Sequence, residues 1–174
     1  MADTMLDKTL KGLPPVYSER TRLLVLGSFP SVASLAQQQY YAHPRNHFWP
    51  ILSAIWGLTG AESLQQRPYA ERVAYVRDKG LGIWDVYAHC ERKGSLDSDI
   101  RNAELNDLAD LIRQAPFLQA IAHNGGESAR HMRITRAFGL PVVKLPSTSP
   151  ANASWHFERK LAAWQEAFER YGLV

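Results

Sequence analysis

The residues best suited to chemistry crowd into one loop early in the chain. Within Tyr40–His47, two tyrosines, two histidines, an arginine and an asparagine surround Pro44, and Phe48 and Trp49 follow at once. These side chains can contact a ligand by stacking or hydrogen bonding, and a loop that only connects two elements rarely needs so many of them. Because sites concentrate on loops held by a scaffold, the segment predicts a binding role.

A small-residue turn stands ahead of this loop. The apolar run Leu23–Gly27 is typical of a buried strand, and it stops at the sequence Gly-Ser-Phe-Pro-Ser, residues Gly27–Ser31. The turn is too short for a phosphate loop of the Walker type and has no lysine. By itself it predicts a tight exit from a strand. Together with the loop that follows, it predicts a site at the carboxyl end of that strand in an open α/β sheet.

A second polar loop, Leu145–Ala153, follows the last apolar run, and it carries three hydroxyls between two prolines. A stiff loop with hydroxyl and backbone donors suits phosphate oxygens, and the small apolar residues after it could press into a duplex as a wedge. The alternative is structural, because serine and asparagine near a helix start are often only caps. The residues predicted to contact a duplex are Ser147, Thr148, Ser149, Pro150 and Ala151.

Two further apolar runs end in polar groups. Asn124 could present its amide to the edge of a ligand, and Gly125 and Gly126 after it would let a backbone approach closely; a plain glycine turn is equally consistent. Asp85 could orient water or a base, and an aspartate that only shapes a turn is the alternative.

Strands and helices are predicted to alternate along the chain. Short apolar stretches predict strands at Arg22–Ser28, Leu81–Tyr87, Leu118–Asn124 and Pro141–Pro146. Helical spacing of apolar residues predicts helices at Asn46–Leu58, Tyr69–Lys79, Ala103–Ala115, Glu127–Phe138 and Ser154–Tyr171. Side chains predicted to point inward include Leu105, Met132, Ile134, Trp155 and Trp164.

This alternation favours a four-stranded parallel sheet that is covered on both faces. Right-handed crossovers would bring all four carboxyl ends of the strands to one edge. The four most polar turns of the chain follow those ends, so we expect them to meet there and to form the site.

Composition excludes several classes of protein. The 174 residues, 45% hydrophobic and 21% charged, predict a single globular domain, residues 1–174. No run approaches the roughly 18 apolar residues of a membrane helix, and Met1–Lys8 lacks the apolar core of a secretory signal. The single cysteine, Cys90, is predicted to be buried or half-buried and favours a reducing compartment, the cytoplasm. A net charge of +3 permits nucleic-acid binding without requiring it.

Metal and cofactor chemistry is not predicted. His43 and His47 are the only histidine pair with metal-ligand spacing, and Pro44 argues against the helix on which they would share a face. One cysteine cannot supply a cluster held by four thiolates.

Taken together, these motifs resemble a known family, the uracil-DNA glycosylase superfamily, and most of all its hypoxanthine-DNA (DNA-deoxyinosine) glycosylase branch. Four blocks carry the resemblance in the expected order, and together they span nearly the whole chain. They are Gly27–Ser31, Tyr40–Trp49, Gly82–Val86 continued by Gly94–Asp97, and Leu145–Pro150. The second block is the most specific. The resemblance implies a three-layer α/β/α fold around a four-stranded parallel sheet.

One departure from the superfamily decides the expected substrate. Mismatch-specific uracil enzymes carry an asparagine in the first turn that positions the attacking water, and this chain has Phe29 there. The hypoxanthine branch is thought to rely on an asparagine of the second block, and that role falls on Asn46. The resemblance therefore implies removal of a deaminated base, hypoxanthine first, from DNA.

The expected mechanism flips the base and hydrolyses its glycosidic bond with water, leaving an abasic site. Tyr41 would stack on the base, Asn124 and the turn with Ser28 and Phe29 would bind it, and Asn46 would orient the water, the base or both. No cofactor, no protein partner and a monomer are expected. A uracil or thymine mismatch glycosylase on the same fold, and a non-catalytic binder of damaged or single-stranded DNA, are the alternatives.

Overall fold

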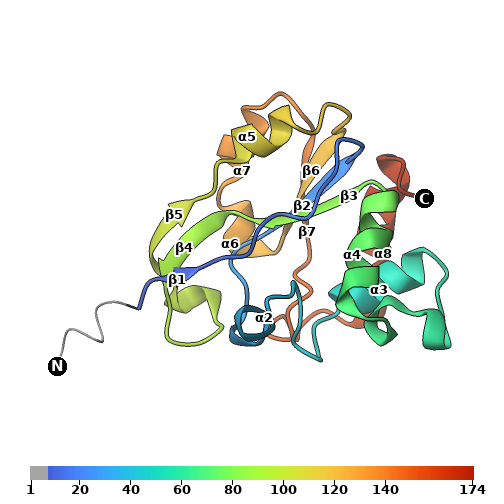
Figure 1. The fold of residues 1–174 in the computed structure, drawn as a ribbon, viewed down its shortest axis with the longest axis horizontal. Helices are drawn as coiled ribbons and strands as arrows, with labels where there is room; N and C mark the ends of the chain where they lie inside the picture. The colour runs from blue at the N-terminus through green and yellow to red at the C-terminus, as the bar shows by residue number, and fades with distance from the viewer. Residues whose placement is uncertain (1–7) are drawn as a thin grey trace.

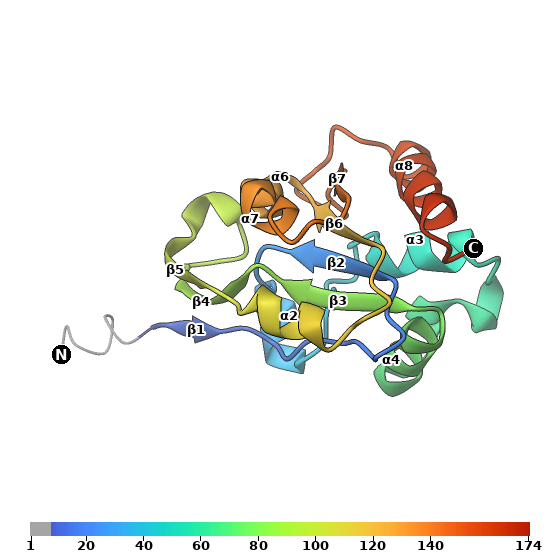
Figure 2. The same cartoon turned by 90° about the horizontal axis from the view of Figure 1, so that it is seen from above.

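A central sheet of four parallel strands organises the protein in a computed structural model that describes residues 8–174. The strand order is β3-β2-β6-β7, and the strands are β2 (Leu23–Gly27), β3 (Leu81–Asp85), β6 (Ala120–Asn124) and β7 (Val142–Leu145). Figure 2 shows β2 and β3 side by side with their arrowheads in the same direction. All four predicted strands are confirmed, each slightly shorter than predicted. The expectation about a secretory signal concerns residues outside the described range.

Seven helices and three short 3-10 turns connect and cover the strands within the described residues (Figure 1). The helices are α2 (Val32–Gln37), α3 (Phe48–Ile55), α4 (Tyr69–Asp78), α5 (Leu108–Arg113), α6 (Gly126–Ala129), α7 (Met132–Arg136) and α8 (Phe157–Arg170). The 3-10 turns are η1 (Gly60–Glu62), η2 (Leu64–Gln66) and η3 (Asp97–Asp99).

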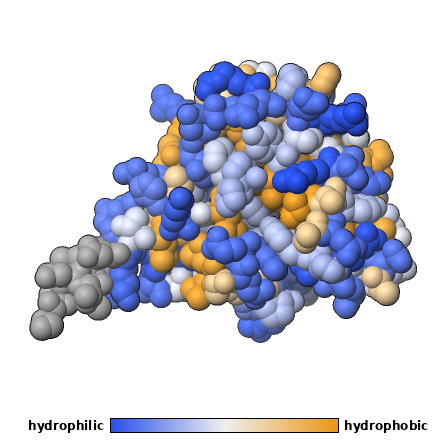
Figure 3. Space-filling view, in the orientation of Figure 1, coloured by the Kyte–Doolittle hydropathy of each residue, from blue (hydrophilic) through white to orange (hydrophobic). Residues whose placement is uncertain are grey.

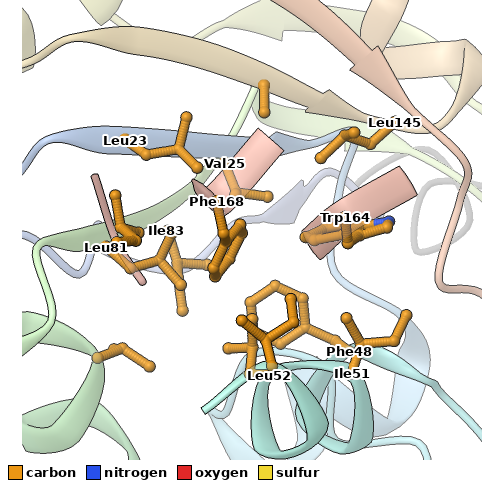
Figure 4. Packing of buried hydrophobic residues seen from close by; sticks show 14 of the residues in the cluster. Leu23, Val25, Phe48, Ile51, Leu52, Leu81, Ile83, Leu145, Trp164 and Phe168 are labelled. Atoms are coloured by element: carbon orange, nitrogen blue, oxygen red, sulfur yellow. The ribbon is translucent and has the colours of Figure 1, made fainter. Parts of the chain in front are cut away.

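The two faces of the sheet bury different sets of side chains. Along β2, Leu23 and Val25 point into one core, and Leu24 and Leu26 point into the other, because successive strand residues face opposite sides. The first core, here called the α3/α8 core, lies between the sheet and the helices α3, α4 and α8, as Figures 1 and 4 show. The second, the α5/α7 core, includes Leu108 and Leu111 of α5, with residues beside α7 packed against it. The predicted three-layer α/β/α fold is confirmed.

The α3/α8 core is rich in aromatic side chains. Figure 4 shows the ring of Phe48, at the start of α3, near Trp164 of α8, and their ring centroids lie 5.9 Å apart at a near-perpendicular angle. Edge-to-face pairs of this kind add to the stabilisation from burial alone. The core therefore fixes α3, and with it the loop that enters this helix, against the end of the sheet.

A second sheet was not predicted. Strands β1 (Leu10–Lys11), β4 (Tyr87–Glu91) and β5 (Arg101–Leu105) form a three-stranded antiparallel sheet in the order β1-β4-β5. The helix predicted from Ala103 to Ala115 is therefore wrong in its first turn, and only α5 is helical there. Leu105, predicted to point inward, is 44% exposed, because pairing with β4 overrides the helical spacing of the leucines.

The predicted helix Glu127–Phe138 is two short helices, α6 and α7. The break between them shifts the helical period, so Ile134 is 40% exposed rather than inward-facing. Thr135 is buried in its place, and its hydroxyl meets the buried ring of His123 at 2.8 Å. A polar contact, invisible in a hydropathy pattern, determines which face of α7 turns inward.

Candidate functional site

The carboxyl ends of the four parallel strands surround a cavity of about 660 Å³. Its wall includes Gly27–Ser31 after β2, Asp85 at the end of β3, Asn124–Gly126 after β6 and Ser147–Ser149 after β7. The predicted meeting of the four polar turns is confirmed. The volume suits one planar heterocycle with part of its sugar.

Gly27 allows the floor of this cavity to close. A Cβ atom on Gly27 would lie 2.5 Å from Oδ1 of Asp85 and 3.1 Å from the hydroxyl oxygen of Tyr41. Only a residue without a side chain lets the carboxylate and the phenol approach the backbone this closely. The glycine at the end of β2 is thus required by the site rather than by the turn.

The turn after Gly27 is held by a loop that the sequence analysis left without a role. Ser28 donates a hydrogen bond to Oδ1 of Asp97 at 2.6 Å, and Arg92 donates to the carbonyl oxygens of Pro30, at 2.6 Å, and Gly94. The Arg92 guanidinium also lies 5.2 Å from the ring centroid of Phe29. Phe29 is one of the residues that line the cavity, and its nearly buried apolar side chain belongs to the α5/α7 core and offers no hydrogen bond to water.

Tyr41 is held against α3 and against β6. Its ring stacks on Phe48 with a centroid distance of 3.9 Å, and its hydroxyl accepts a hydrogen bond from Nδ2 of Asn124. The backbone of Tyr41 has a φ of +55°, which is unusual for a residue with a side chain and marks a constrained position. Burial raises the pKa of this phenol, so the hydroxyl stays protonated. The side chain lines the cavity, and its stacking on a base remains a prediction.

The side-chain amide of Asn124 bonds to other protein groups in this structure, whereas the sequence suggested that it faces a ligand. Its Oδ1 accepts from the backbone N–H of Thr148, and its Nδ2 donates to Oγ1 of Thr148 as well as to Tyr41. The amide therefore ties three strand-end loops together within the protein. A direct hydrogen bond from this amide to a base stays a prediction and requires one of these bonds to exchange.

Asn46 lies on the cavity wall at the entrance to α3. Its Oδ1 accepts a hydrogen bond from the backbone N–H of Phe48 at 2.9 Å, which turns the chain into the helix. Within residues 8–174, its Nδ2 group makes no hydrogen bond. The side chain thus has one end fixed and a free donor at the cavity, as an orienting amide needs.

The loop after β7 is rigid, and its members differ in exposure. Nε1 of Trp164 donates to the carbonyl oxygen of Pro146, and the backbone N–H of His47 donates to the carbonyl oxygen of Thr148. Thr148 is fully buried, so its side chain cannot reach a phosphate in this structure, which corrects its predicted role. The half-buried Ser147, Ser149 and Pro150 and the exposed Ala151 keep an accessible position near the cavity mouth.

Two other side chains on the cavity wall, and one that packs behind the loop entering α3, escaped sequence reasoning. Trp155, predicted to be core, is half-buried, lines the cavity and carries the guanidinium of Arg159 at 3.7 Å from its ring centroid. Lys144 also lies on the wall, although the sequence pattern showed no lysine near the site. Buried Lys160 contacts Nδ1 of His47 at 3.2 Å. No local pattern marks these residues, because separate elements bring them together.

Asp85 lines the cavity and is buried, since the whole residue is only 4% exposed. Burial, with a smaller contribution from the nearby Asp97 and against the opposing effect of Arg92, raises the pKa of this carboxyl to about 7. The side chain of Asn106 donates to the backbone carbonyl of Asp85, which anchors the strand end but leaves the carboxylate unpaired by that contact.

The model of the uracil DNA glycosylase superfamily matches residues 14–169. The chain belongs to the uracil DNA glycosylase superfamily. Its match covers the four strand ends that build the cavity, including the loops with Asn46 and Ser147–Ala151.

Relatives within the superfamily resemble the chain over almost its whole length. A hypoxanthine DNA glycosylase of Methanosarcina barkeri is 38% identical over 160 residues, which are 92% of this chain and 98% of the relative. A hypoxanthine DNA glycosylase of Methanosarcina acetivorans is 35% identical, over 91% of this chain and 97% of the relative. A solution NMR structure of a candidate uracil DNA glycosylase from Methanosarcina acetivorans superposes with a TM-score of 0.82 at 34% identity, covering 94% of this chain and 98% of that one.

Residues 8–174 contain no group of three or more histidine, cysteine, aspartate or glutamate side chains placed to hold a metal ion. No helix in the same range has the length and apolar character needed to cross a membrane. Hydrophilic residues cover most of the face in Figure 3, with apolar patches between them.

Proposed function

We propose that this protein is a monofunctional DNA glycosylase that removes hypoxanthine, the deaminated form of adenine, and leaves an abasic site. The free amide donor of Asn46 at the cavity, beside an apolar Phe29 in the first turn, is the observation that carries the proposal. The names and the length-wide similarity of the two hypoxanthine DNA glycosylases support it. A monomer in the cytoplasm, on DNA and without a protein partner, belongs to the same proposal.

The reaction needs a base that leaves with negative charge and a sugar that becomes oxocarbenium-like. Extruding the nucleotide costs a few kcal/mol, least where the base pairs poorly, as hypoxanthine does. Water then adds to C1′ while the C1′–N9 bond breaks, and the proton that the water loses ends on the departing base. Donors that are preorganised toward the developing charge supply much of the rate.

The amide of Asn46 contributes by orientation. An amide is a poor general base, so it positions the water or donates to the base rather than taking a proton. Its Oδ1 is already engaged with the backbone of Phe48, which leaves Nδ2 for the substrate. Tyr41, stacked on Phe48, offers the aromatic surface against which the extruded base would lie.

The first test compares two substitutions of Asn46 on duplexes that contain inosine. Asn46→Ser keeps a side-chain oxygen that can accept from the N–H of Phe48, whereas Asn46→Ala removes it. If the free amide donor is catalytic, both variants lose single-turnover excision by roughly 100-fold or more, the scale of a lost preorganised donor. Thermal unfolding should distinguish them, with Asn46→Ala less stable by about 1 kcal/mol. Wild-type excision by the folded serine variant would remove Asn46 from the catalytic residues.

A panel of duplexes with inosine, uracil, xanthine and thymine separates this function from its alternatives. We expect inosine to react fastest, because Phe29 stands where a uracil enzyme has a polar side chain. Faster release of uracil or thymine opposite guanine would support the mismatch glycosylase. Tight, salt-dependent binding with no abasic product on any duplex would support the non-catalytic binder.

Lys144 makes the water mechanism testable as well. Its side chain is exposed and lies on the cavity wall, so a Schiff base with the sugar has to be examined. We expect borohydride to trap no covalent adduct with DNA. An adduct that forms with the wild type and disappears in Lys144→Ala would contradict attack by water.

A further inference from the structure

The carboxyl group of Asp85 is buried, but one of its oxygens has no hydrogen-bond donor. Its Oδ2 is buried and accepts no hydrogen bond within residues 8–174. An ionised or polar oxygen that is buried without a donor destabilises a fold by a substantial amount, so native proteins rarely keep one. Gly27 makes room for this carboxyl at the cavity floor, and a larger residue there would displace it.

The charged and titratable groups around Asp85 do not supply the missing donor. Asp97, from η3, is itself acidic and accepts from Ser28. Arg92 directs Nη2 and Nε to the carbonyls of Pro30 and Gly94, and its buried Nη1 makes no hydrogen bond to Asp85 or to any other described residue. Tyr40 donates to the backbone near β1, and the hydroxyl of Tyr41 accepts from the amide of β6. No hydrogen bond reaches Oδ2 of Asp85 within residues 8–174, so a ligand in the cavity is a candidate donor for this carboxyl.

The depth of Asp85 indicates which part of a substrate meets it. Ala151 is exposed, Asn46 is half-buried and Asp85 is 4% exposed, and all three line the same cavity, so we place Asp85 on its inner side. A flipped nucleotide keeps its sugar and phosphates at the open side, where the strand continues. The edge of the base that is farthest from the sugar then reaches the floor, and in a purine that edge carries N1 and the group on C6.

Deamination inverts the hydrogen-bonding character of that edge. Adenine presents an acceptor at N1 and an amino donor on C6, whereas hypoxanthine presents an N1–H donor and a carbonyl oxygen. A carboxylate only accepts hydrogen bonds, so it matches N1–H and repels the lone pair of adenine N1. Ser28 and Phe29 line the same cavity, and their backbone N–H groups, which have no partner among the described residues, could donate to the carbonyl oxygen.

We propose that Asp85 is the specificity-determining acceptor for the N–H that deamination creates, so that the site selects bases with an adjacent N–H and C=O over bases with an amino group. The proposal rests on the glycosylase function proposed above. It assigns Asp85 to reading the base edge and leaves the water to Asn46, which lies nearer the sugar.

The first experiment removes the N–H from the base and the carboxylate from the protein in turn. Duplexes carry hypoxanthine or 1-deazahypoxanthine, in which a C–H replaces that N–H, on a 2′-fluoroarabino sugar whose glycosidic bond resists hydrolysis. We expect the wild type at pH 8 to bind the hypoxanthine duplex on the order of 10- to 100-fold more tightly, the scale of a hydrogen bond to a buried charge. For Asp85→Ala the two affinities should be equal, because differences in base pairing belong to the DNA and cancel in the comparison.

This binding experiment separates the present proposal from the proposed function. An equal preference for the N–H in wild type and Asp85→Ala would overturn the role of Asp85 even if the enzyme removes hypoxanthine. Loss of the preference in Asp85→Ala, together with no excision by the wild type of any base in the panel, would uphold the reading of the base and reject the glycosylase.

A pH profile supplies a readout that a merely structural role would not move. The single-turnover rate of the wild type on inosine should fall as the pH drops below about 7, where Asp85 becomes protonated, by up to tenfold per pH unit. Asp85→Asn should lack this limb. Asp97→Asn should shift the limb to lower pH, because removing the neighbouring negative charge lowers the pKa of Asp85. An unchanged limb in Asp85→Asn would overturn the assignment.

Thermal unfolding of Asp85→Asn guards against a misfolded variant. The substitution removes a buried charge without a partner, so we expect its Tm at pH 8 to equal or exceed that of the wild type. A lower Tm at that pH would mean that the carboxylate stabilises the fold, and would overturn the assignment.

Discussion

At the scale of single residues, the site depends on how closely Gly27 allows two side chains to approach the end of β2. The carboxyl of Asp85 and the hydroxyl of Tyr41 both lie where a side chain at position 27 would begin. Both groups line the cavity, one as the proposed reader of the base edge and the other on the proposed stacking surface. Their positions relative to each other are therefore set by the absence of a single methyl group.

Gly27→Ala should impair both activity and folding. The added Cβ would force Asp85 and Tyr41 apart, and a displacement of this size costs roughly 10- to 100-fold in single-turnover rate. The unfolding free energy should fall by about 1–3 kcal/mol, as for other overpacked sites. Excision of hypoxanthine and urea unfolding measure the two effects.

Gly94→Ala is the matched control for this substitution, because a Cβ there would meet nothing within 4 Å. It should keep the rate and the stability of the wild type. An equal loss of rate in both variants would mean that general loosening, rather than the contact at Gly27, is responsible.

At the scale of elements, a buried histidine holds α6 and α7 on β6. His123 is fully buried, with Nδ1 2.7 Å from Oγ of Ser128 and Nε2 2.8 Å from Oγ1 of Thr135. Ser128 gives its proton to the carbonyl of Leu26, so Nδ1 of the histidine must donate and Nε2 of the neutral ring accepts. Burial lowers the pKa of His123 to about 4, with the neighbouring His131 adding to the shift.

This arrangement makes stability depend on pH. The unfolded chain binds a proton on this histidine near pH 6.5 and the folded one near pH 4, so stability is full above 6.5 and declines as the pH falls toward 4. We expect the loss to be on the order of 2 kcal/mol. Urea unfolding at pH 7.5 and pH 4.5 measures it, and the loss should be smaller by that amount in His123→Asn. The exposed His156→Asn should retain the loss, and an unchanged loss in His123→Asn would refute the assignment.

At the scale of the whole molecule, the two cores share the strands between them. Leu23 and Leu24, adjacent in β2, belong to the α3/α8 core and the α5/α7 core respectively. Loss of either core would expose one face of the same buried strands. The domain predicted from residues 1–174 should therefore unfold as one cooperative unit.

Two intrinsic probes test this cooperativity. Trp49 and Trp164 lie in the α3/α8 core, and Cys90, the only cysteine, is buried in the α5/α7 core. In urea, tryptophan fluorescence and the reactivity of the thiol toward a disulfide reagent should change with the same midpoint. Reaction of Cys90 at clearly lower urea would show that the α5/α7 side opens on its own.

Several features followed from the sequence because they depend on local patterns. The apolar runs identified the four parallel strands, and the helical stripe of α8 with Trp164 was plain. The polar turns after those runs placed Asn46, Tyr41 and Ser147–Ala151 near one another, because parallel strands present their carboxyl ends at one edge. Motif order was enough to indicate the superfamily.

Other features were decided by tertiary structure alone. Strand β5 formed where leucine spacing predicted a helix, because its hydrogen bonds to β4 outweigh a weak local preference. Thr148 was buried by Asn124 and His47, which are distant in sequence.

Asp85 is the clearest case of a residue whose role depends on tertiary structure. Sequence alone left it either a turn residue or a participant in chemistry. Only packing against Gly27, with no hydrogen bond to Oδ2, distinguishes the two, because the desolvation of a charge depends on all its neighbours in space and not on those along the chain.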